Sequence, residues 1–194
     1  FKIKENPEML SEGHYVKLNV EKYGGLICST WFDRPLSVAG RLIVKENGKL
    51  VSKLVNVDRD LLMIPNLAIH MNREVNDGYK YSIQKDMLPL FGNEDAKGTF
   101  MDIVAAAAGV EKDAILGNDL FLYNRMKGRI WGANNEFFSI GRIDDLQCAF
   151  SSLEGFLAAE DGASMPVHAV FDNEEVGSQT KQGAAGTFLL DTLL

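Results

Sequence analysis

The first two-fifths of the chain alternate between apolar and polar positions, which is the pattern of β-strands with one buried face. Val16, Leu18 and Val20 are separated by charged or polar residues, and the glycine pair after Tyr23 ends this run. A second strand is predicted over residues 26–32, where an Asp-Arg-Pro sequence closes it. The chain is therefore expected to begin as short strands joined by turns.

The clearest local signal is a predicted hairpin. Residues 38–46 and 50–57 read as two strands that flank Asn47-Gly48. This dipeptide favours a tight turn because both of its positions tolerate a positive φ angle. Several short strands separated by turn signals predict an antiparallel sandwich or barrel for this part of the chain.

The middle of the chain mixes one helix with further extended segments. A helix is predicted over residues 98–108 and ends at Gly109, because glycine readily takes the left-handed conformation after a last helical turn. Residues 118–123 and 130–140 are predicted to be extended, with glycines interrupting the second range. The segment thus continues the β-rich first part.

Helical spacing replaces this alternation in the last third. The apolar positions with that spacing are Leu146, Ala149, Phe150, Leu153, Phe156 and Leu157. The helix is predicted to begin at Asp145 and to end at Asp161-Gly162. A short strand over 167–171 and a helix from near Thr180 follow. This order is typical of an α/β fold, and the change of composition near Ile140 predicts a domain boundary.

Composition excludes several classes of protein. The 194 residues are 46% hydrophobic and carry a net charge of −7, which argues against a nucleic-acid partner because phosphate contacts need clustered Lys and Arg. No apolar run approaches the roughly 18–20 residues of a membrane helix. Cys28 and Cys148 form no CxxC motif, so neither a disulfide framework nor a thiolate zinc site is expected. A cytoplasmic location is predicted.

Two acidic pairs, Asp144-Asp145 and Glu174-Glu175, stand at junctions between predicted elements. Adjacent carboxylates repel unless a cation neutralises them, and a divalent metal is the natural cation for carboxylate oxygens. One carboxylate of such a pair can bind metal while the other takes a proton from water. The competing interpretation is a solvated turn, or a helix start stabilised by the helix dipole.

The three histidines differ in their surroundings. His14 is predicted to lie in an exposed loop, and His168, within an apolar run, is predicted to be structural. His70 has no such simple assignment. The sequence contains no HExxH, P-loop, GxSxG or dinucleotide-binding motif.

Three segments in order resemble the aspartyl aminopeptidase family of dinuclear zinc exopeptidases. They are residues 64–73 (IPNLAIHMNR), 141–146 (GRIDDL) and 171–178 (FDNEEVGS). Residues 87–92 and 118–123 are also similar to that family. The resemblance extends over essentially the whole chain.

The resemblance implies roles for four residues. Asp144 corresponds to the carboxylate that bridges two zinc ions, and Glu175 to a ligand of one of them. Glu174 corresponds to the general base that activates a metal-bridging hydroxide. His70 corresponds to a histidine that reaches a neighbouring subunit's active site and stabilises the oxyanion. The implied reaction is hydrolysis of N-terminal residues, preferably Asp or Glu, from peptides.

Other parts of the family pattern have no counterpart. The upstream His-x-Asp motif and the later Asp and His ligands are not matched, so Asp144 and Glu175 are the only candidate ligands. Zinc sites normally use at least three protein ligands. The chain also begins without Met and ends in an apolar run. We therefore expect an internal fragment of a longer enzyme, catalytically inactive alone.

The resemblance also implies the architecture. Residues 6–138 correspond to an inserted, β-rich dimerisation domain, whereas residues 1–5 and 139–194 correspond to part of a zinc-exopeptidase α/β sandwich catalytic domain. Dimers would assemble into a tetrahedral dodecamer. Two alternatives stay open at this stage: an oligomerisation or scaffolding module without catalysis, and a related aminopeptidase of different specificity, such as a deblocking aminopeptidase.

Overall fold

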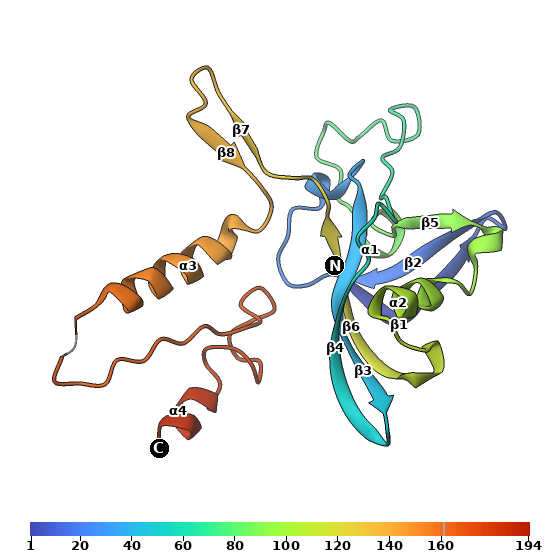
Figure 1. The fold of residues 1–194 in the computed structure, drawn as a ribbon. Coiled ribbons are helices and arrows are strands. Elements are labelled where there is room, and N and C mark those ends of the chain that lie inside the picture. Colours follow the sequence, from blue (N-terminus) through green and yellow to red (C-terminus); the bar gives the residue numbers. More distant parts are fainter. Residues whose placement is uncertain (161) are drawn as a thin grey trace. The chain divides into compact units, whose positions relative to one another are not determined.

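The chain divides into two units, Phe1–Arg125 and Met126–Leu194, in a computed structural model that describes residues 1–160 and 162–194. Figure 1 traces the strands and helices of both units in chain order. The combination of strands and helices confirms the predicted α/β class. The two units meet between residues 125 and 126, where contacts within the chain divide them. The domain boundary after residue 138 rests on the family resemblance and stays a prediction.

The first unit is built on one antiparallel sheet of six strands in the order β4-β3-β6-β1-β2-β5. The strands are β1 (Lys2–Ser11), β2 (Tyr15–Glu21), β3 (Leu36–Glu46), β4 (Lys49–Asn56), β5 (Leu90–Asn93) and β6 (Ile115–Asn124). The first predicted strand is confirmed as β2, with Leu18 at its centre. The predicted hairpin is confirmed as β3 and β4, with φ angles of 50° at Asn47 and 78° at Gly48.

The sheet curls until it nearly closes on itself. Leu62 exchanges backbone hydrogen bonds with Leu36 at the start of β3, at 2.9 and 3.0 Å. Its neighbour Met63 does the same with Leu90 in β5, at 3.3 and 2.7 Å. The bridging segment thus connects an edge strand with a strand near the other edge. The predicted antiparallel sandwich or barrel is accordingly observed as a curled sheet with barrel-like closure.

The core fills the concave side of this sheet. Alternate residues of β2 and β3 are fully buried, and the helix α2 (Phe100–Ala108) adds Phe100 and Val104. Complete burial of one such aliphatic side chain stabilises the fold by roughly 1.5–3 kcal/mol. The buried residues of the two strands are Val16, Leu18, Val20, Leu36, Val38, Leu42 and Val44.

Both ends of α2 are explained by the sequence and by one distant contact. Gly109 takes the left-handed conformation (φ 65°) and donates its N–H to Ala105 and Ala106, which confirms the predicted helix end. At the other end, the Glu8 carboxylate from β1 accepts hydrogen bonds from the N–H groups of Gly98 and Phe100. The N-terminal amides of a helix lack partners within the helix, so a carboxylate stabilises them.

Two parts of the first unit differ from the sequence prediction. The predicted strand over 26–32 is wrong: the chain forms the 3-10 helix η1 (Cys28–Trp31), where the Thr30 hydroxyl donates to the Ile27 carbonyl at 2.8 Å and closes a local turn. Strand β1 was not predicted, because it is highly charged and contains Pro7 at a register shift. The remaining short elements are α1 (Ile83–Asp86), η2 (Glu94–Ala96) and η3 (Lys112–Ala114).

The second unit contains a hairpin followed by two helices. Strands β7 (Arg129–Trp131) and β8 (Phe137–Ser139) confirm the extended character predicted over 130–140, and Gly132 (φ 109°) lies in their turn. Helix α3 (Ile143–Ala158) confirms the predicted helix. Its predicted end at Asp161 lies outside the described residues. The short helix α4 (Phe188–Leu193) ends the unit.

Two predictions for this unit are wrong. Residues 167–171 form no strand in the described part of the chain, because a strand needs a hydrogen-bonded neighbour and none lies beside them. The helix predicted from Thr180 begins only at Phe188. Turns precede it, and the backbone at Gly183 approaches so closely that an added Cβ would lie 2.3 Å from the Ser178 carbonyl oxygen. This close approach of the backbone belongs to the turns that precede the helix. Glycine also weakens a helix interior, which favours turns over a helix in this segment.

Candidate functional site

The Glu174-Glu175 pair lies at the surface of the second unit, in a tight turn. Residues 174–176 form the turn, and the Gly177 N–H closes it by donating to the Asn173 carbonyl at 2.9 Å. Asn173 (φ 66°) and Gly177 (φ 134°) both have positive φ angles, which the short Asn side chain and glycine tolerate. Both carboxylates are exposed. The pair is therefore held on a defined turn with its side chains open to a ligand.

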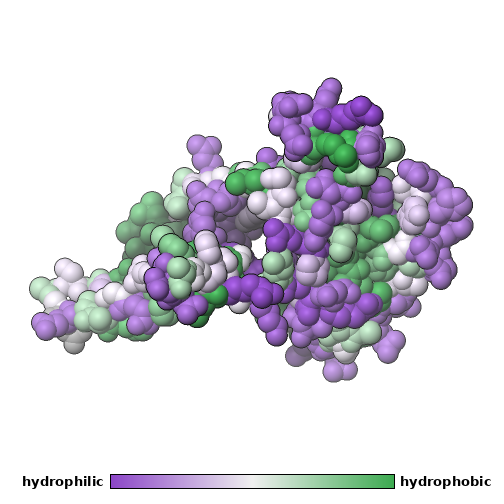
Figure 2. Space-filling model, turned by 90° about the horizontal axis from the view of Figure 1, so that it is seen from above, coloured by the Kyte–Doolittle hydropathy of each residue, from purple (hydrophilic) through white to green (hydrophobic). Residues whose placement is uncertain are grey.

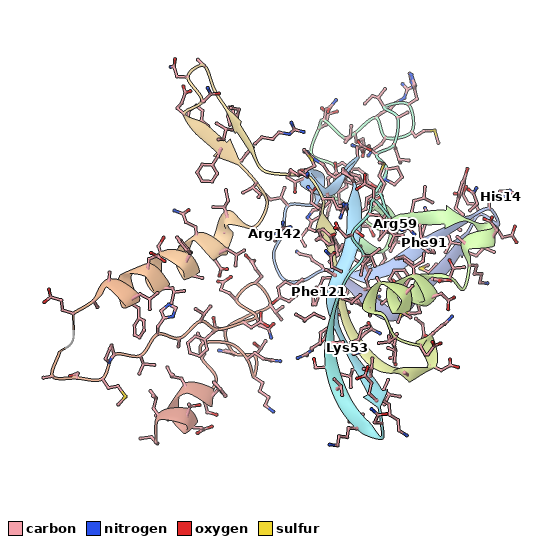
Figure 3. All side chains as sticks on the ribbon, viewed as in Figure 1. His14, Lys53, Arg59, Phe91, Phe121 and Arg142 are labelled. Atoms are coloured by element: carbon pink, nitrogen blue, oxygen red, sulfur yellow. The ribbon has the colours of Figure 1, made fainter. Side chains whose placement is uncertain are left out.

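Asp144 lies at the beginning of α3, where the backbone departs from helical geometry. Arg142, labelled in Figure 3, precedes it with a left-handed φ of 68°. Asp144 itself has φ −79° and ψ 117°, which is extended, and the peptide bond to Asp145 is cis. Its side chain is exposed. The N-terminal end of a helix favours acidic side chains, so this position suits an aspartate.

His70 belongs to the other unit and lies on a loop made of consecutive turns. The Met71 N–H donates to the Ala68 carbonyl at 2.8 Å, and the next turns of the loop follow directly. His70 is exposed, and its apolar neighbours Ile69 and Met71 are 48% and 75% exposed. A projecting loop that holds a histidine among exposed apolar side chains is suited to contact another surface.

The base of this loop is held by a residue that the sequence did not reveal as functional. Asp33 follows η1 with a positive φ of 55°, and its Oδ1 accepts a hydrogen bond from the Asn66 N–H at 2.9 Å. Its own N–H donates to the Ile64 carbonyl at 2.9 Å. The Asp33-Arg34-Pro35 sequence indicates only a turn. Its anchoring of the loop depends on a contact 33 residues away in the sequence.

The candidate metal ligands do not meet in a cluster of three among the described residues. Over 1–160 and 162–194, no three His, Cys, Asp or Glu side chains come close enough to hold a metal ion together. Asp144 and Glu175 supply oxygen donors of the type that divalent metals bind. Their chemistry fits a metal ion, but a complete zinc site needs additional ligands. The structure assigns His70 to the first unit and Asp144, Glu174 and Glu175 to the second.

His168 is confirmed as a structural residue. Its Nε2 lies 2.9 Å from the Ser152 hydroxyl, and its ring packs on Phe156 with a centroid separation of 5.6 Å. His14 is confirmed as an exposed residue in the turn between β1 and β2. Of the three histidines, His70 is therefore the one that is both exposed on a projecting loop and part of a family-like motif.

Comparison with known proteins identifies relatives over the whole chain. The family described as aminopeptidase I zinc metalloprotease (M18) matches residues 1–194. A probable M18 family aminopeptidase 2 of Clostridium acetobutylicum is 50% identical, and the match covers 100% of this chain and 46% of that protein. Its counterpart in Pseudomonas paraeruginosa is 37% identical over 99% of this chain and 46% of its own length.

Solved structures show the same similarity. Chaetomium thermophilum mApe1 matches with a TM-score of 0.85 and 31% identity, covering 99% of this chain and 47% of that protein. The S. cerevisiae mApe1 dodecamer matches with a TM-score of 0.76 and 28% identity, covering 99% and 45%. The chain thus spans about half the length of the curated relatives it matches.

Proposed function

Because the chain belongs to the aminopeptidase I zinc metalloprotease (M18) family, we propose that the full-length protein is a zinc aminopeptidase that removes N-terminal residues from peptides. The family match over residues 1–194 carries this proposal. We further propose a preference for N-terminal Asp or Glu, which rests on the resemblance of residues 64–73, 141–146 and 171–178 to aspartyl aminopeptidases.

Asp144 and Glu175 are the residues of this chain that would hold metal. In the complete site, Asp144 would bridge two zinc ions and Glu175 would bind one of them. When bound, the ions act as Lewis acids on the peptide carbonyl and lower the pKa of water. The exposed carboxylate of Glu175 and the helix start that presents Asp144 support these assignments.

Glu174 is the proposed general base. It would take a proton from the attacking water and pass it to the amine that leaves when the peptide bond breaks. Its neighbour Glu175 keeps the ligand role, so the two adjacent carboxylates have separate tasks. The closed turn supports this division, since Asn173 and Gly177 fix the backbone on either side of the pair.

His70 is the proposed donor to the carbonyl oxygen as negative charge develops on it in the transition state. We propose that it acts in a neighbouring subunit of a homo-oligomer, in which dimers assemble into a tetrahedral dodecamer. Its exposure on the loop anchored by Asp33 supports this role. The related S. cerevisiae mApe1 forms a dodecamer, which supports the assembly.

The 194-residue chain alone is proposed to be inactive. Asp144 and Glu175 are its two candidate ligands, whereas a zinc ion normally needs at least three protein ligands. One face of α3 also exposes apolar side chains that an amphipathic helix normally buries. Figure 2 shows such apolar surface on the second unit, at the left of the view. The exposed residues of α3 are Leu146 (60%), Phe150 (63%), Leu153 (39%) and Leu157 (68%).

Neither a nucleic acid nor a lipid bilayer is proposed as a partner. The net charge of −7 disfavours binding to phosphates. In the part of the chain that the structure describes, no helix has the length and apolar character needed to cross a membrane. A cytoplasmic location is proposed from the two cysteines, which lie in no disulfide or CxxC motif among the described residues.

Turnover of two matched substrates tests the proposed function. The full-length protein should release β-naphthylamine from Glu-β-naphthylamide faster than from Leu-β-naphthylamide, and a chelator should abolish both activities. Zinc should restore them. Activity that survives complete metal removal would contradict the metallopeptidase proposal, whereas faster turnover of the Leu substrate would contradict only the acidic preference.

A further inference from the structure

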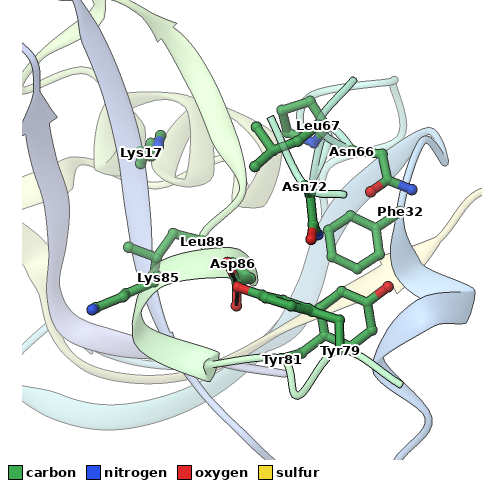
Figure 4. Close-up of a pocket in the computed structure, with 11 residues that line it drawn as sticks. Lys17, Phe32, Asn66, Leu67, Asn72, Tyr79, Tyr81, Lys85, Asp86 and Leu88 are labelled. Carbon is green, nitrogen blue, oxygen red and sulfur yellow. Dashed lines mark hydrogen bonds between the residues drawn. The ribbon is translucent and has the colours of Figure 1, made fainter. Parts of the chain in front are cut away.

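A small cavity lies beneath the loop that carries His70, within the first unit. Its volume is about 110 Å³, well above the roughly 10–15 Å³ that admits one water molecule. Pockets for drug-sized ligands are several times larger, at about 300–1,000 Å³. The cavity therefore has room for a small metabolite. Figure 4 shows the side chains that surround it.

One wall of the cavity is apolar and largely aromatic. The rings of Phe32 and Tyr81 lie with their centroids 5.1 Å apart, and those of Tyr79 and Tyr81 lie 5.2 Å apart. Leu67 and Leu88 extend this wall. Figure 4 shows the three rings gathered on one side of the cavity. Such a wall favours a ligand with an apolar side chain.

Asp86 places a carboxylate beside these rings. It accepts hydrogen bonds from the Tyr79 hydroxyl at 3.2 Å and from the Ser82 N–H at 2.6 Å. Desolvation, followed by the charge of Asp86, raises the pKa of Tyr79. A carboxylate offers about four acceptor positions, so Asp86 retains capacity for a cationic group. Asp86 forms no ion pair among the described residues.

Lys17 supplies the opposite charge on the other side of the cavity. It projects from β2 and is half-buried, and Figure 4 shows it across the cavity from the ring of Phe32. The ion pairs in the described part of the chain do not include it. The amide of Asn72 adds a further polar group to the lining. The lining thus combines a cation, an anion and an apolar wall.

We propose that this cavity binds a free α-amino acid with an apolar side chain. The ligand's ammonium group would contact the Asp86 carboxylate and the faces of the neighbouring rings, and its carboxylate would contact the Lys17 ammonium. The apolar side chain would lie on the wall that Phe32 helps to form. A ligand with only one charge is less suited, because it leaves either Asp86 or Lys17 unpaired in a partly desolvated site.

Occupancy of this cavity would also act on the loop above it. Asn66 and Leu67 precede His70 and Asn72 follows it, and all three line the cavity. A bound amino acid would therefore hold the loop on both sides of His70. This consequence for catalysis rests on the role proposed for His70, whereas the binding itself does not.

Calorimetric titration of the metal-free full-length protein with L-leucine tests the proposal. Without metal, leucine cannot bind as a product at a zinc site, so the titration reports on the cavity. The cavity proposal can therefore be wrong while the proposed peptidase activity is right, and the peptidase proposal can be wrong while leucine still binds. We expect saturable binding of one leucine per chain. 4-Methylpentanoate lacks the amine and 3-methylbutylamine lacks the carboxylate. Each should bind about tenfold or more weakly, as the loss of one charged hydrogen bond predicts.

Matched variants locate the site. Asp86→Asn and Lys17→Met should each weaken leucine binding about tenfold or more. Lys49→Met is the control, because Lys49 is exposed on β4 and is not among the residues that line the cavity. Leucine should also slow amide hydrogen exchange over residues 66–72. Absence of saturable binding, wild-type affinity in Lys17→Met, or unchanged exchange over this segment would overturn the proposal.

Discussion

The Nε2 atom of His168 lies 2.9 Å from the Oγ atom of Ser152, and this hydroxyl donates its only proton to the Ala149 carbonyl at 3.0 Å. Both contacts are satisfied together when the Ser152 hydroxyl accepts a hydrogen bond from the Nε2–H tautomer of His168. The contact joins α3 to the segment that leads to the acidic turn. It is a structural tie within the second unit.

Replacing His168 should weaken this tie. His168→Ala removes the hydrogen bond and the contact with Phe156, and we expect a loss of about 1 kcal/mol in the free energy of unfolding. Urea denaturation of the full-length protein measures it. His14→Ala is the matched control, because His14 lies exposed in a turn and should leave the stability unchanged. Equal stability of the two variants would contradict the structural role.

Asp33 is expected to affect catalysis through the loop that it anchors. Asp33→Ala removes the acceptor for the Asn66 N–H, so His70 should be held less firmly and kcat should fall about tenfold while the zinc content stays the same. Asp33→Asn retains both an acceptor oxygen and tolerance of positive φ, and should restore most of the activity. A kcat of Asp33→Ala equal to that of the wild type would show that the anchor has no influence on turnover.

His70 itself should matter more. His70→Phe keeps a ring of similar size but removes the proposed donor to the developing oxyanion. We expect kcat to fall about 10²–10³-fold, the range found for removal of one such donor, with unchanged zinc stoichiometry. Steady-state kinetics and metal analysis of the full-length variant give both numbers. Unchanged kinetics would reduce His70 to a structural residue.

The ion cluster around Asp119 should make stability depend on pH. The hydrogen bond from Lys2, with a further one from Arg41, lowers the pKa of Asp119. A lowered pKa stabilises the folded state above the unfolded-state value of about 3.9, and this contribution disappears as the pH falls through the folded-state value.

Asp119→Asn should therefore be less stable than the wild type at pH 7, by less than about 1 kcal/mol because water screens these partly exposed charges. The difference should shrink as the pH falls below about 4. Urea denaturation at several pH values measures it. A difference that grows on acidification would contradict the assigned direction of the pKa change.

Local signals in the sequence predicted the elements that local interactions determine. Asn47-Gly48 and Gly109 specify their turn and helix end through backbone conformations that few other residues take. Strand β1 was missed because pairing with β2 and β6 decides its conformation. The requirement for glycine at position 40 also comes from a neighbouring strand, because a Cβ there would lie 2.0 Å from the Asp119 carbonyl oxygen in β6.

The candidate site also contains residues with a local signal in the sequence and residues without one. Glu174-Glu175 and Asp144 stand out because each lies in a contiguous motif that resembles the aminopeptidase family. The anchor Asp33 and the cavity residue Asp86 have no comparable signal, since their partners become visible only when distant segments fold together. Contacts of this kind cannot be inferred from one sequence.

Glu174→Gln in the full-length protein tests most directly whether Glu174 is the general base that we propose for a zinc aminopeptidase. The amide keeps the shape of the side chain but cannot take a proton, so kcat should fall about 10²–10⁴-fold while the zinc content per subunit stays at the wild-type value. Glu154→Gln, which alters an exposed carboxylate on α3, should retain activity. A Glu174→Gln enzyme with near-normal kcat and full zinc occupancy would contradict the account.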